Sequence, residues 1–564
     1  MGQLKFRGRR STWLITVVAL IAALVFAAAC SSAQPTATQA PPTPKPAATA
    51  APVATATPVP ARPGATNTPA VTSITPKRGG VIKFPQSISI DAPDPAYSVL
   101  TGTRIILPPV YGFLVKQMPD GKVAPDLAES WDVSADGKTI TFNLRKGVKF
   151  QDGTDFNAQA VKWNYDRYLD PKVGSPRRAE LAPPLTSVDV VDDNTVKFQL
   201  ASPFRPLLAV LTLQAGSIAS PTAVQKYKSY DDRTGEFGRR PVGAGPFKLD
   251  EWIAGTSFKF SRNETYWDKT MPYLDGIYMP IIGDVGIQFA MLRTGEVDVM
   301  EKMDAQNIPI VERNSDLRVV VREGTSTTAF WMRITTKPWD NINLRQAIAY
   351  AVNRDAIGQV VFAGRAQAAQ SVVGPSHGQW FDPTVKVYER SIPKAKEMLA
   401  KAGYPNGFSF DMPCRTGGID GQSCEVVQAG LAEAGINMNI KPYDNVTYFS
   451  DFAARKMEGP LVSYWSARPD PGVLLRLLYH TKGSQNSWAY SNPQVDKLIE
   501  DADGVYDVAK AKAMYNQVQT IVAQDSPIVY LSWWNAYFGV RNSVRNFNTY
   551  LDAIPRFADV WLDK

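Results

Sequence analysis

The stretch that decides the fold runs from Tyr111 to Phe156 and reads YGFLVKQMPDGKVAPDLAESWDVSADGKTITFNLRKGVKFQDGTDF. Asp136-Gly137 has the composition of a tight hairpin turn. After this turn, Ile140, Phe142 and Leu144 alternate with polar residues, which is the period-two pattern of a half-buried strand. The PDLAESW segment before it suits either a short helix or an extended strand. Taken alone, these residues predict a β-hairpin.

The order of these elements closely resembles the family 5 extracellular solute-binding proteins, the dipeptide, oligopeptide and nickel receptors of ABC importers. In that family the most recognisable segment is the run Y-G/E-x-L … PDG … PDLAESW … DGKTYTF-x-L-R-x-G-V-K-F-x-DG. This sequence matches nearly every element of it. The resemblance implies a receptor, not an enzyme, that closes on a small ligand outside the cytoplasmic membrane.

Further matches to the family extend from about residue 78 to residue 564. They are Pro241–Leu249 with Trp252, Arg262–Trp267, Pro272–Gly276, Gly295–Asp298, Asn353–Ile357, Tyr404–Phe408 and Gln428–Ile436. The resemblance implies an α/β, two-lobe fold like that of class II periplasmic binding proteins, with an extra hairpin-rich domain and two hinge crossings. The expected parts are a first lobe at 78–122, 241–328 and 527–564, an extra domain at 123–240, and a second lobe at 329–526.

Several secondary-structure elements can be predicted from the residues themselves. Val188–Leu200 reads as a second hairpin that turns at Asp192-Asp193-Asn194. Asn157 is expected to cap a helix whose inward face carries Val161, Tyr165 and Tyr168, and Asn343 to cap another. Two more helices are expected at 493–502 and 509–524, the last of them stopped by Pro527.

The N-terminus has the features of an export signal. Lys5, Arg7, Arg9 and Arg10 precede an apolar run from Trp13 to Ala29, so residues 1–29 are expected to be a signal peptide. Ala27-Ala28-Ala29-Cys30 resembles a lipobox, in which Cys30 would be diacylated and become the mature N-terminus. The alternative is an ordinary cleaved signal with an incidental Cys30. Sec export fits better than twin-arginine export, although the Arg9-Arg10 pair leaves the latter open.

Residues 30–77 are expected to form a tether after the lipidated cysteine. This segment consists mainly of Pro, Thr, Ala and Ser, and it has too few large apolar side chains to bury. We therefore expect an extended, disordered chain that lets a globular receptor stand off the membrane. Glycosylation of the tether is left open.

Charge and motif content argue against several function classes. The formal net charge is +8, and Lys5, Arg7, Arg9 and Arg10 of the signal segment account for four of these charges. No basic cluster with interleaved aromatic residues suggests nucleic acid. With only His377 and His480, and with no Gly-x-Ser-x-Gly elbow, phosphate loop or His-Glu-x-x-His, the sequence offers no catalytic constellation, cofactor site or metal site.

Cys414 and Cys424 are expected to form a disulfide. They are the two cysteines left after Cys30, they belong to an exported protein, and a turn-rich loop lies between them. A metal site is the rival interpretation, but no histidine lies nearby and two thiols alone are fewer ligands than a metal site in a protein normally has.

Ligand recognition is expected to depend on Arg468. In peptide receptors of the family that this sequence resembles, an Asp stands three residues after a Trp and pairs with the amino group of the peptide. Here Trp465 is followed by Arg468 at that position, and Asp470 comes two residues later. Arg415 lies close to a position where dipeptide-binding members carry an Arg. Two guanidiniums would suit a carboxylate. Alternatively, Arg468 forms a structural pair with Asp470 or another acid.

Among the aromatic residues, Trp465 and Tyr97 are expected to line the cleft, and most others to be core. The expected ligand is a peptide or peptide-like solute that is delivered to an ABC permease and ATPase. The alternatives are an oligosaccharide, an opine or a chelated metal as the ligand, or a sensor or chaperone of the same fold. The protein is expected to be a monomer outside the cytoplasm, held by the lipid anchor to the outer face of the cell membrane or periplasmic.

Overall fold

The computed structural model of the chain covers the globular part. It describes residues 75–86, 93–98, 100–181, 184–227, 236–301, 303–385, 388–444, 447–448, 451 and 459–564. The expected signal segment and Cys30 lie outside the described residues. Within those ranges no helix has the length and apolar character needed to cross a membrane.

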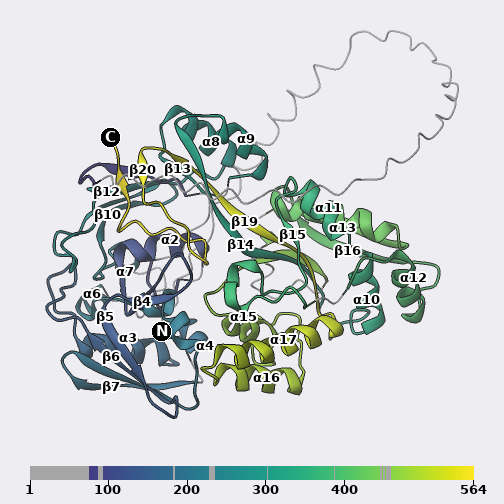
Figure 1. Cartoon of the computed structure of the whole chain (residues 1–564), viewed down its shortest axis with the longest axis horizontal. Helices are drawn as coiled ribbons and strands as arrows, with labels where there is room; N and C mark the ends of the chain where they lie inside the picture. Colours follow the sequence, from purple (N-terminus) through teal and green to yellow (C-terminus); the bar gives the residue numbers. More distant parts are fainter. Residues whose placement is uncertain are drawn as a thin grey trace, which may run out of the picture. The chain divides into compact units, whose positions relative to one another are not determined.

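The first lobe is built on a four-stranded sheet with the strand order β1-β12-β11-β10. The strands are β1 (Val81–Lys83), β10 (Phe247–Ile253), β11 (Ser257–Arg262) and β12 (Gly276–Pro280). β1 pairs in parallel with β12, whereas the other pairs are antiparallel. Helix α2 (Thr101–Val110) and the C-terminal segment share one apolar core with this sheet. Figure 1 accordingly shows the C-terminus close to β12.

A second four-stranded sheet, antiparallel with the order β5-β6-β8-β7, forms what we call the hairpin domain. Its strands are β5 (Ala128–Val133), β6 (Thr139–Leu144), β7 (Leu185–Asp192) and β8 (Thr195–Leu200). Helix α3 (Ala158–Leu169) packs on this sheet through Val161, Tyr165 and Tyr168, and Asn157 caps it by accepting a hydrogen bond from the Ala160 amide. The two hairpins and the Asn157 helix thus agree with the sequence prediction. The last four residues of the PDLAESW segment form the first part of strand β5.

Two long antiparallel strands connect the lobes (Figure 1). They are β14 (Leu317–Trp331) and β19 (Ile528–Arg541), paired from Leu317 with Arg541 at one end to Trp331 with Ile528 at the other. β13 (Val299–Met300) pairs with β19 near the first lobe, whereas β18 (Leu461–Ser466) pairs with the far half of β14. β15 (Gln367–Ala368) also pairs with β19.

The second lobe contains helices on both sides of the far end of this ribbon. One half has the parallel strands β16 (Phe408–Arg415) and β17 (Ile436–Tyr443) with the helices α10 (Ile342–Ala351), α11 (Arg354–Val360), α12 (Ile392–Lys401) and α13 (Gly418–Ala432). The other half has α15 (Pro471–Tyr479), α16 (Pro493–Asp503) and α17 (Val508–Asp525).

Smaller elements complete the described chain. They are β2 (Gly112–Phe113), β3 (Val115–Gln117), β4 (Val123–Pro125), α4 (Arg177–Leu181), α5 (Leu207–Val210), β9 (Ser217–Ile218), α6 (Pro221–Lys226), α7 (Glu236–Arg239), α8 (Val285–Thr294), α9 (Ile308–Glu312), β20 (Val544–Arg545) and β21 (Trp561–Leu562), with 3-10 helices at Gln214–Gly216, Ala305–Asn307 and Pro375–Trp380.

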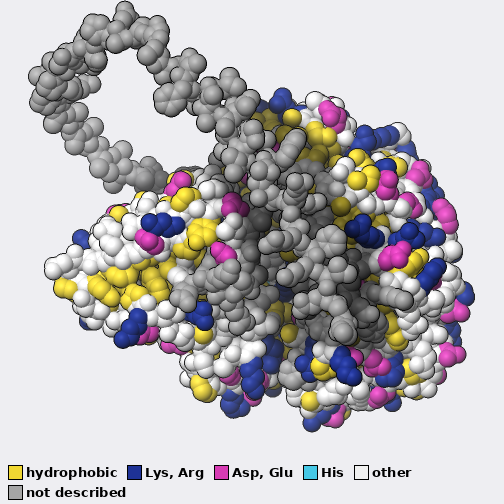
Figure 2. All heavy atoms as spheres, turned by 180° about the vertical axis from the view of Figure 1, so that it is seen from behind, with side chains coloured by type: hydrophobic (Ala, Val, Ile, Leu, Met, Phe, Trp, Pro, Cys, Tyr) yellow, Lys and Arg dark blue, Asp and Glu magenta, His cyan; other side chains and the backbone are white. Residues whose placement is uncertain are grey.

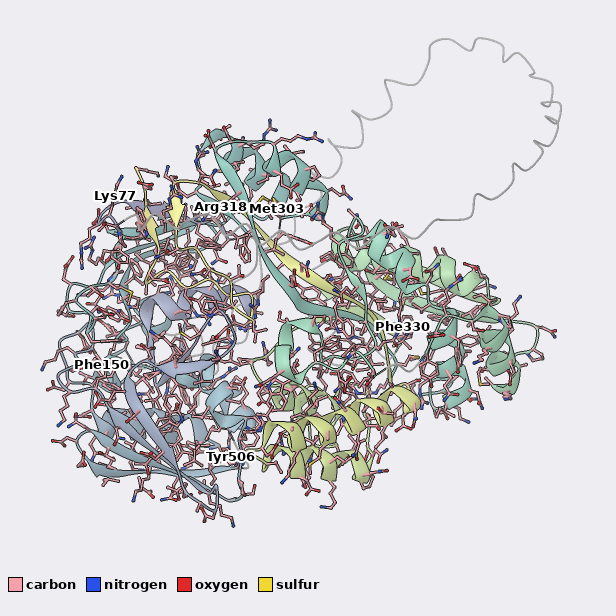
Figure 3. The ribbon with its side chains drawn as sticks, viewed as in Figure 1. Lys77, Phe150, Met303, Arg318, Phe330 and Tyr506 are labelled. Carbon is pink, nitrogen blue, oxygen red and sulfur yellow. A yellow bond between two sulfur atoms is a disulfide. The ribbon has the colours of Figure 1, made fainter. Side chains whose placement is uncertain are left out.

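Separate apolar cores hold these parts. Phe150 belongs to the core of the hairpin domain, Met303 to a small core beside α8 and α9, and Phe330 to a core of the second lobe (Figure 3). The core of the hairpin domain also includes Val473 and Leu477 of α15, so this domain packs against the second lobe.

Two local predictions differ from the structure. Helix α10 is capped by Asn341, whose side chain accepts a hydrogen bond from the Asn343 amide, so Asn343 lies inside the helix. The loop expected between Cys414 and Cys424 is short, because α13 begins at Gly418 and already contains Cys424. In each case a second candidate cap or turn residue lies within three positions, and local sequence does not choose between them.

Candidate functional site

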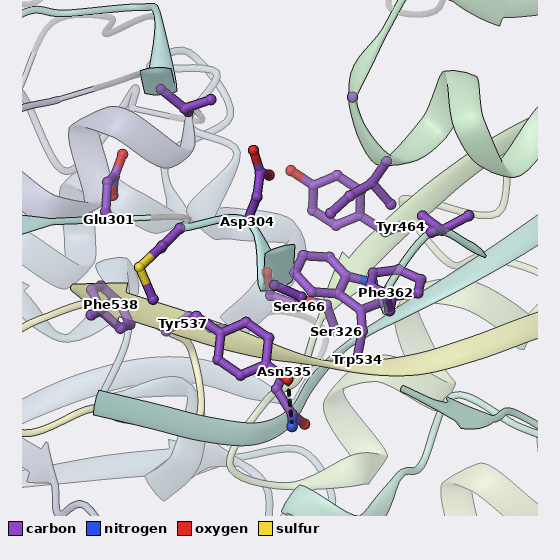
Figure 4. Close-up of a pocket in the computed structure, with 18 of the residues that line it drawn as sticks. Glu301, Asp304, Ser326, Phe362, Tyr464, Ser466, Trp534, Asn535, Tyr537 and Phe538 are labelled. Carbon is purple, nitrogen blue, oxygen red and sulfur yellow. Dashed lines mark hydrogen bonds between the residues drawn. The ribbon is translucent and has the colours of Figure 1, made fainter. Parts of the chain in front are cut away.

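A cavity of about 360 Å³ lies where the two lobes meet the β14–β19 ribbon. The first lobe contributes Ile105 and the loop 552–554, and the second lobe contributes Phe362, Tyr464 and the first turn of α13. The ribbon contributes Ser326 and the stretch 534–538. Figure 4 shows these side chains around one space. A site lined by both lobes is the arrangement expected of a receptor that buries its ligand by closing.

Aromatic rings form much of the wall of this cavity (Figure 4). The Trp534 ring stacks on Phe362 with centroids 5.7 Å apart, and Tyr464 meets it edge-on at 5.4 Å. The indole Nε1 of Trp534 donates to Thr328 Oγ1 over 3.0 Å, which fixes the ring orientation. Rings held in this way offer apolar surface to a ligand at little cost in conformational entropy.

Hydrogen-bonding groups are placed between the rings. Asn535 Oδ1 accepts from the Gly324 amide at 2.8 Å, and Asn535 Nδ2 donates to the Tyr537 hydroxyl at 3.1 Å, the contact dashed in Figure 4. Ser326 and Ser466, which face each other across the β14–β18 pair, add two hydroxyls. Polar groups of fixed orientation among apolar walls provide specificity in a ligand site.

Two carboxylates, Glu301 and Asp304, lie on the same side of the cavity (Figure 4). They come from the segment between β13 and the 3-10 helix Ala305–Asn307. Burial raises the pKa of Asp304 above its usual value, because desolvation disfavours the charged form. A cationic group of a ligand would relieve that cost.

The structure places Arg468 two residues beyond Ser466, in the loop between β18 and α15. Its Nη1 atom is buried and has no hydrogen-bond partner among the described residues. The alternative of a pair with Asp470 is not what the structure has. The Asp470 carboxylate caps α15 by accepting from the Gly472 amide at 2.8 Å and pairs with Arg205 of the hairpin domain. The predicted ligand contact of Asp470 is therefore already occupied by protein groups.

Arg415 ends β16 and pairs with Asp420 in the first turn of α13. Its guanidinium also lies 5.6 Å from the centroid of the Tyr448 ring. The structure joins Cys414 to Cys424 by a disulfide, which ties this end of β16 to α13. Since Gly418 and Ile419 of the same turn line the cavity, Arg415 supports the cavity wall. A ligand contact of Arg415 remains a prediction.

Trp465 and Tyr97, the two aromatic residues expected in the cleft, are not among the residues that line this cavity. Trp465 stacks on Trp331 with centroids 3.9 Å apart and meets Trp488 edge-on at 5.7 Å. Because side chains alternate along a strand, Tyr464 and Ser466 face the cavity and Trp465 faces the opposite side of β18. Tyr97 packs against the core of the hairpin domain, with Arg167 5.5 Å from its ring centroid.

Several cavity residues were missed by the sequence analysis. Phe362, Tyr537 and Glu301 belong to no recognised motif, and Trp534 was counted with the core. The pairing of β14 with β18 and β19 brings Ser326 beside Ser466 and Trp534, which lie 140 and 208 residues away in the sequence (466 − 326 and 534 − 326). The alternation of side chains along a strand shows that Trp533 and Trp534 point to opposite faces, but it does not show which of the two faces the cavity.

The surface outside the cleft has mixed charge. Figure 2 shows Lys and Arg side chains interspersed with Asp and Glu over the face opposite to that of Figure 1.

In the described part of the chain, no group of three or more His, Cys, Asp or Glu side chains could hold a metal ion.

Comparison with known proteins places this chain among solute-binding proteins. Residues 122–486 match the family described as bacterial extracellular solute-binding proteins, family 5 middle. A glutathione-binding protein from Shigella flexneri serotype 5b is 34% identical over 411 residues, which is 71% of this chain and 79% of the relative.

Solved structures show the same arrangement. The Helicobacter pylori periplasmic binding protein DppA in complex with the peptide STSA superposes with a TM-score of 0.79 at 27% identity, covering 86% of this chain and 99% of that one. The binding protein AgaA in complex with agropinic acid, from A. tumefaciens R10, superposes with a TM-score of 0.77 at 25% identity, covering 86% and 99%. The mixed α/β fold predicted from the sequence is confirmed.

Proposed function

The chain belongs to the family 5 bacterial extracellular solute-binding proteins, and on this premise we propose that it captures a peptide-like solute between its two lobes and delivers it to the permease and ATPase of an ABC importer. Members of this family are non-catalytic receptors that act outside the cytoplasm. The chain would therefore bind and release its solute unchanged.

The observation that carries this proposal is the cavity shared by the two lobes. Its rings, Phe362, Tyr464 and Trp534, suit the side chains of a small peptide, and its amide and hydroxyl groups suit a peptide backbone. The relatives support the same ligand class, because their names refer to glutathione, which is itself a small peptide, and to the peptide STSA.

Native mass spectrometry of the protein purified from its own host, followed by denaturation and identification of the released small molecule, tests the proposal. Titration calorimetry would then measure the affinity of the protein for reduced glutathione, the dipeptide Met-Leu, the peptide STSA and agropinic acid. We expect a co-purified peptide-like solute and at least one measurable affinity in the panel. A co-purified sugar, or no binding to any peptide, would contradict the proposal.

Substitution of Trp534 tests the cavity itself. We expect Trp534→Ala to weaken binding of the peptide identified above by about 2 kcal/mol, roughly thirty-fold in Kd, because a ligand would lose a fixed stacking surface. Trp252→Ala is the matched control. Trp252 is also half-buried and stacks on a phenylalanine, Phe258, at 5.3 Å, but it lies on β10 of the first lobe. Equal affinities of Trp534→Ala and wild type would place the ligand elsewhere.

How the protein is attached to the membrane is a separate proposal. We propose that the mature chain begins at a diacylated Cys30, because Cys30 directly follows the apolar run in a lipobox-like sequence. Cys30→Ala is expected to move the protein from the membrane fraction to the soluble fraction, as measured by immunoblotting after ultracentrifugation. Cys30→Ala that stays with the membrane as wild type does would rule out the anchor without affecting the ligand proposal.

A further inference from the structure

Three arginine side chains from three parts of the molecule lie close enough for the charge of Arg468 to act on Arg104 and that of Arg177 to act on Arg468. Arg104 lies on α2 of the first lobe, Arg177 on α4 of the hairpin domain, and Arg468 in the loop after β18 of the second lobe. Burial, together with the positive charge of Arg468, lowers the pKa of Arg104 to about 9. Burial also lowers the pKa of Arg468, to which the charge of Arg177 contributes. A guanidinium is a permanently charged group in proteins at neutral pH.

This arginine cluster (Arg104, Arg177 and Arg468) borders the cavity. Asp552, which lines the cavity, lies 3.7 Å from Arg104 Nη2. Ile105, the neighbour of Arg104 on α2, and Ser466, two residues before Arg468, are also lining residues. An anionic group at the Asp552 end of a bound solute would therefore lie next to the cluster.

The protein supplies few acceptors to the cluster. Arg177 pairs with Glu180 at 2.8 Å and donates to the Ser98 carbonyl at 3.2 Å. The Asp552 carboxylate pairs with two arginines. Arg556 is the nearer, at 3.0 Å, and Arg104 lies at 3.7 Å. Glu180 and Asp552 are thus the carboxylates whose charges act on Arg468. They face more guanidiniums than they can neutralise.

Each member of the arginine cluster keeps an unused donor. Arg104 Nη2, Arg177 Nε and Arg468 Nη1 are buried without a hydrogen-bond partner in the part of the chain that the structure describes. The Arg104 side chain is 9% exposed and that of Arg177 is 3% exposed, so both are largely removed from bulk solvent. A buried charged donor without an acceptor is costly, and several together suit an anionic group of a ligand.

We propose that Arg104, Arg177 and Arg468 form an anion subsite that receives a carboxylate of the bound solute and so joins the second lobe to the first. The subsite rests on the proposed function, because a peptide-like solute supplies the carboxylate. The flat guanidinium groups match a carboxylate in shape and charge. Without the solute, like charges on the two lobes repel each other, and the carboxylate turns this repulsion into attraction.

Paired acid and amide probes test the subsite. Titration calorimetry on the full chain would compare reduced glutathione with its glycine carboxamide, and Met-Leu with Met-Leu carboxamide. We expect wild type to bind the acids at least ten-fold more tightly than the amides. Arg468→Ala should weaken the binding of the acids at least ten-fold and leave the binding of the amides unchanged, so that the preference for the acids disappears. Arg468→Lys should recover part of it, because the charge remains and the planar fork is lost.

The control is Arg293→Ala, which removes the same charge from an exposed position on α8 and should keep the wild-type ratio of acid to amide affinity. Thermal unfolding shows whether each variant is folded. An acid preference that survives in folded Arg468→Ala, or equal binding of acid and amide by wild type, overturns the subsite while the proposed function stands. If wild type binds neither member of either pair and no peptide-like solute co-purifies, the proposed function fails, and the subsite fails with it.

Discussion

His377 is a residue whose burial should be visible in the pH dependence of stability. It is 4% exposed, and its Nδ1 accepts from the Gly374 amide at 3.2 Å. Burial lowers its pKa to about 4 from an ordinary value of 6.5. Because the folded protein favours the neutral ring, the stability that His377 contributes is complete above pH 6.5 and is lost as pH falls from 6.5 to 4. The full loss is about 3 kcal/mol.

We expect His377→Gln to flatten the pH dependence of the free energy of unfolding between pH 6.5 and pH 4, as measured by urea denaturation. His480→Gln is the matched control, because His480 is the other histidine of the chain and its Nε2 lies 3.0 Å from Glu500 Oε1. A wild-type slope retained in His377→Gln would show that His377 is already charged or exposed in the folded protein.

The sequence motif of peptide receptors singles out Arg468 but says nothing of the residues around it. The sequence shows that Arg468 stands where peptide receptors of this family carry an Asp. It gives no sign that Arg104, which precedes a Pro108-Pro109 pair on α2, lies beside the same cavity. Tyr464 and Trp465 make the same point, because a period-two pattern separates their faces but the cavity lies on the side that the β14–β18 pairing selects.

At the scale of elements, the disulfide determines how α13 begins. Cys414 lies next to the last residue of β16 and Cys424 lies in α13, so the bond holds the first turns of the helix, which carry Gly418, Ile419 and Gln422 at the cavity. We expect the double substitution Cys414→Ser with Cys424→Ser to lower the free energy of unfolding by about 2–3 kcal/mol, the chain-entropy value for a loop of this length. Urea denaturation with and without reductant measures this.

Reductant should lower the stability of wild type to that of the double variant and leave the variant unchanged. Peptide binding should also weaken in the variant, since the turn that lines the cavity is freed. If wild type is equally stable with and without reductant, the two cysteines are not linked in the folded protein.

Elements with strong local signals were predicted well, and those set by tertiary contacts were not. Asn157 caps α3 as expected, and its side chain accepts a hydrogen bond from the Ala160 amide. α10 was misplaced because Asn341 and Asn343 are both good caps. The start of α13 was missed because Gly417-Gly418 reads as a turn, whereas the ion pair of Arg415 with Asp420 and the disulfide hold the helix there.

At the scale of the whole molecule, the arrangement of lobes follows from the two long strands of the ribbon. Their pairing from Leu317 with Arg541 to Trp331 with Ile528 gives both crossings between lobes. Such pairing between distant segments has no local signature, so the lobes could be predicted only through the family resemblance. Two strands crossing together allow the lobes to rotate about the ribbon while each keeps its own core.

Arg205 should then hold the closed arrangement. It extends from the hairpin domain into the second lobe, where it pairs with Asp470, donates to the Tyr515 hydroxyl at 2.8 Å and lies 4.4 Å from the centroid of the Trp380 ring. The Arg205 and Asp470 side chains are 11% and 8% exposed. If the hairpin domain moves with the first lobe, opening the cleft breaks these contacts and exposes both charges.

We therefore expect Arg205→Met, which keeps the apolar stem but removes the charge, to destabilise the closed state by about 2–5 kcal/mol, the cost of leaving a buried partner unpaired. Stopped-flow fluorescence should show faster release of reduced glutathione, or of the peptide found by mass spectrometry. Small-angle scattering of the peptide-bound variant should give a larger radius of gyration than wild type.

The matched control is Arg262→Met, because Arg262 pairs with Asp275 at 2.5 Å within the first lobe and that contact does not change on opening. Its release rate should equal that of wild type. If Arg205→Met and Arg262→Met release peptide at the same rate and have the same radius of gyration, Arg205 joins parts that move as one body. The hinge would then lie between the hairpin domain and the first lobe, because Asp470 and Tyr515 would carry the hairpin domain with the second lobe.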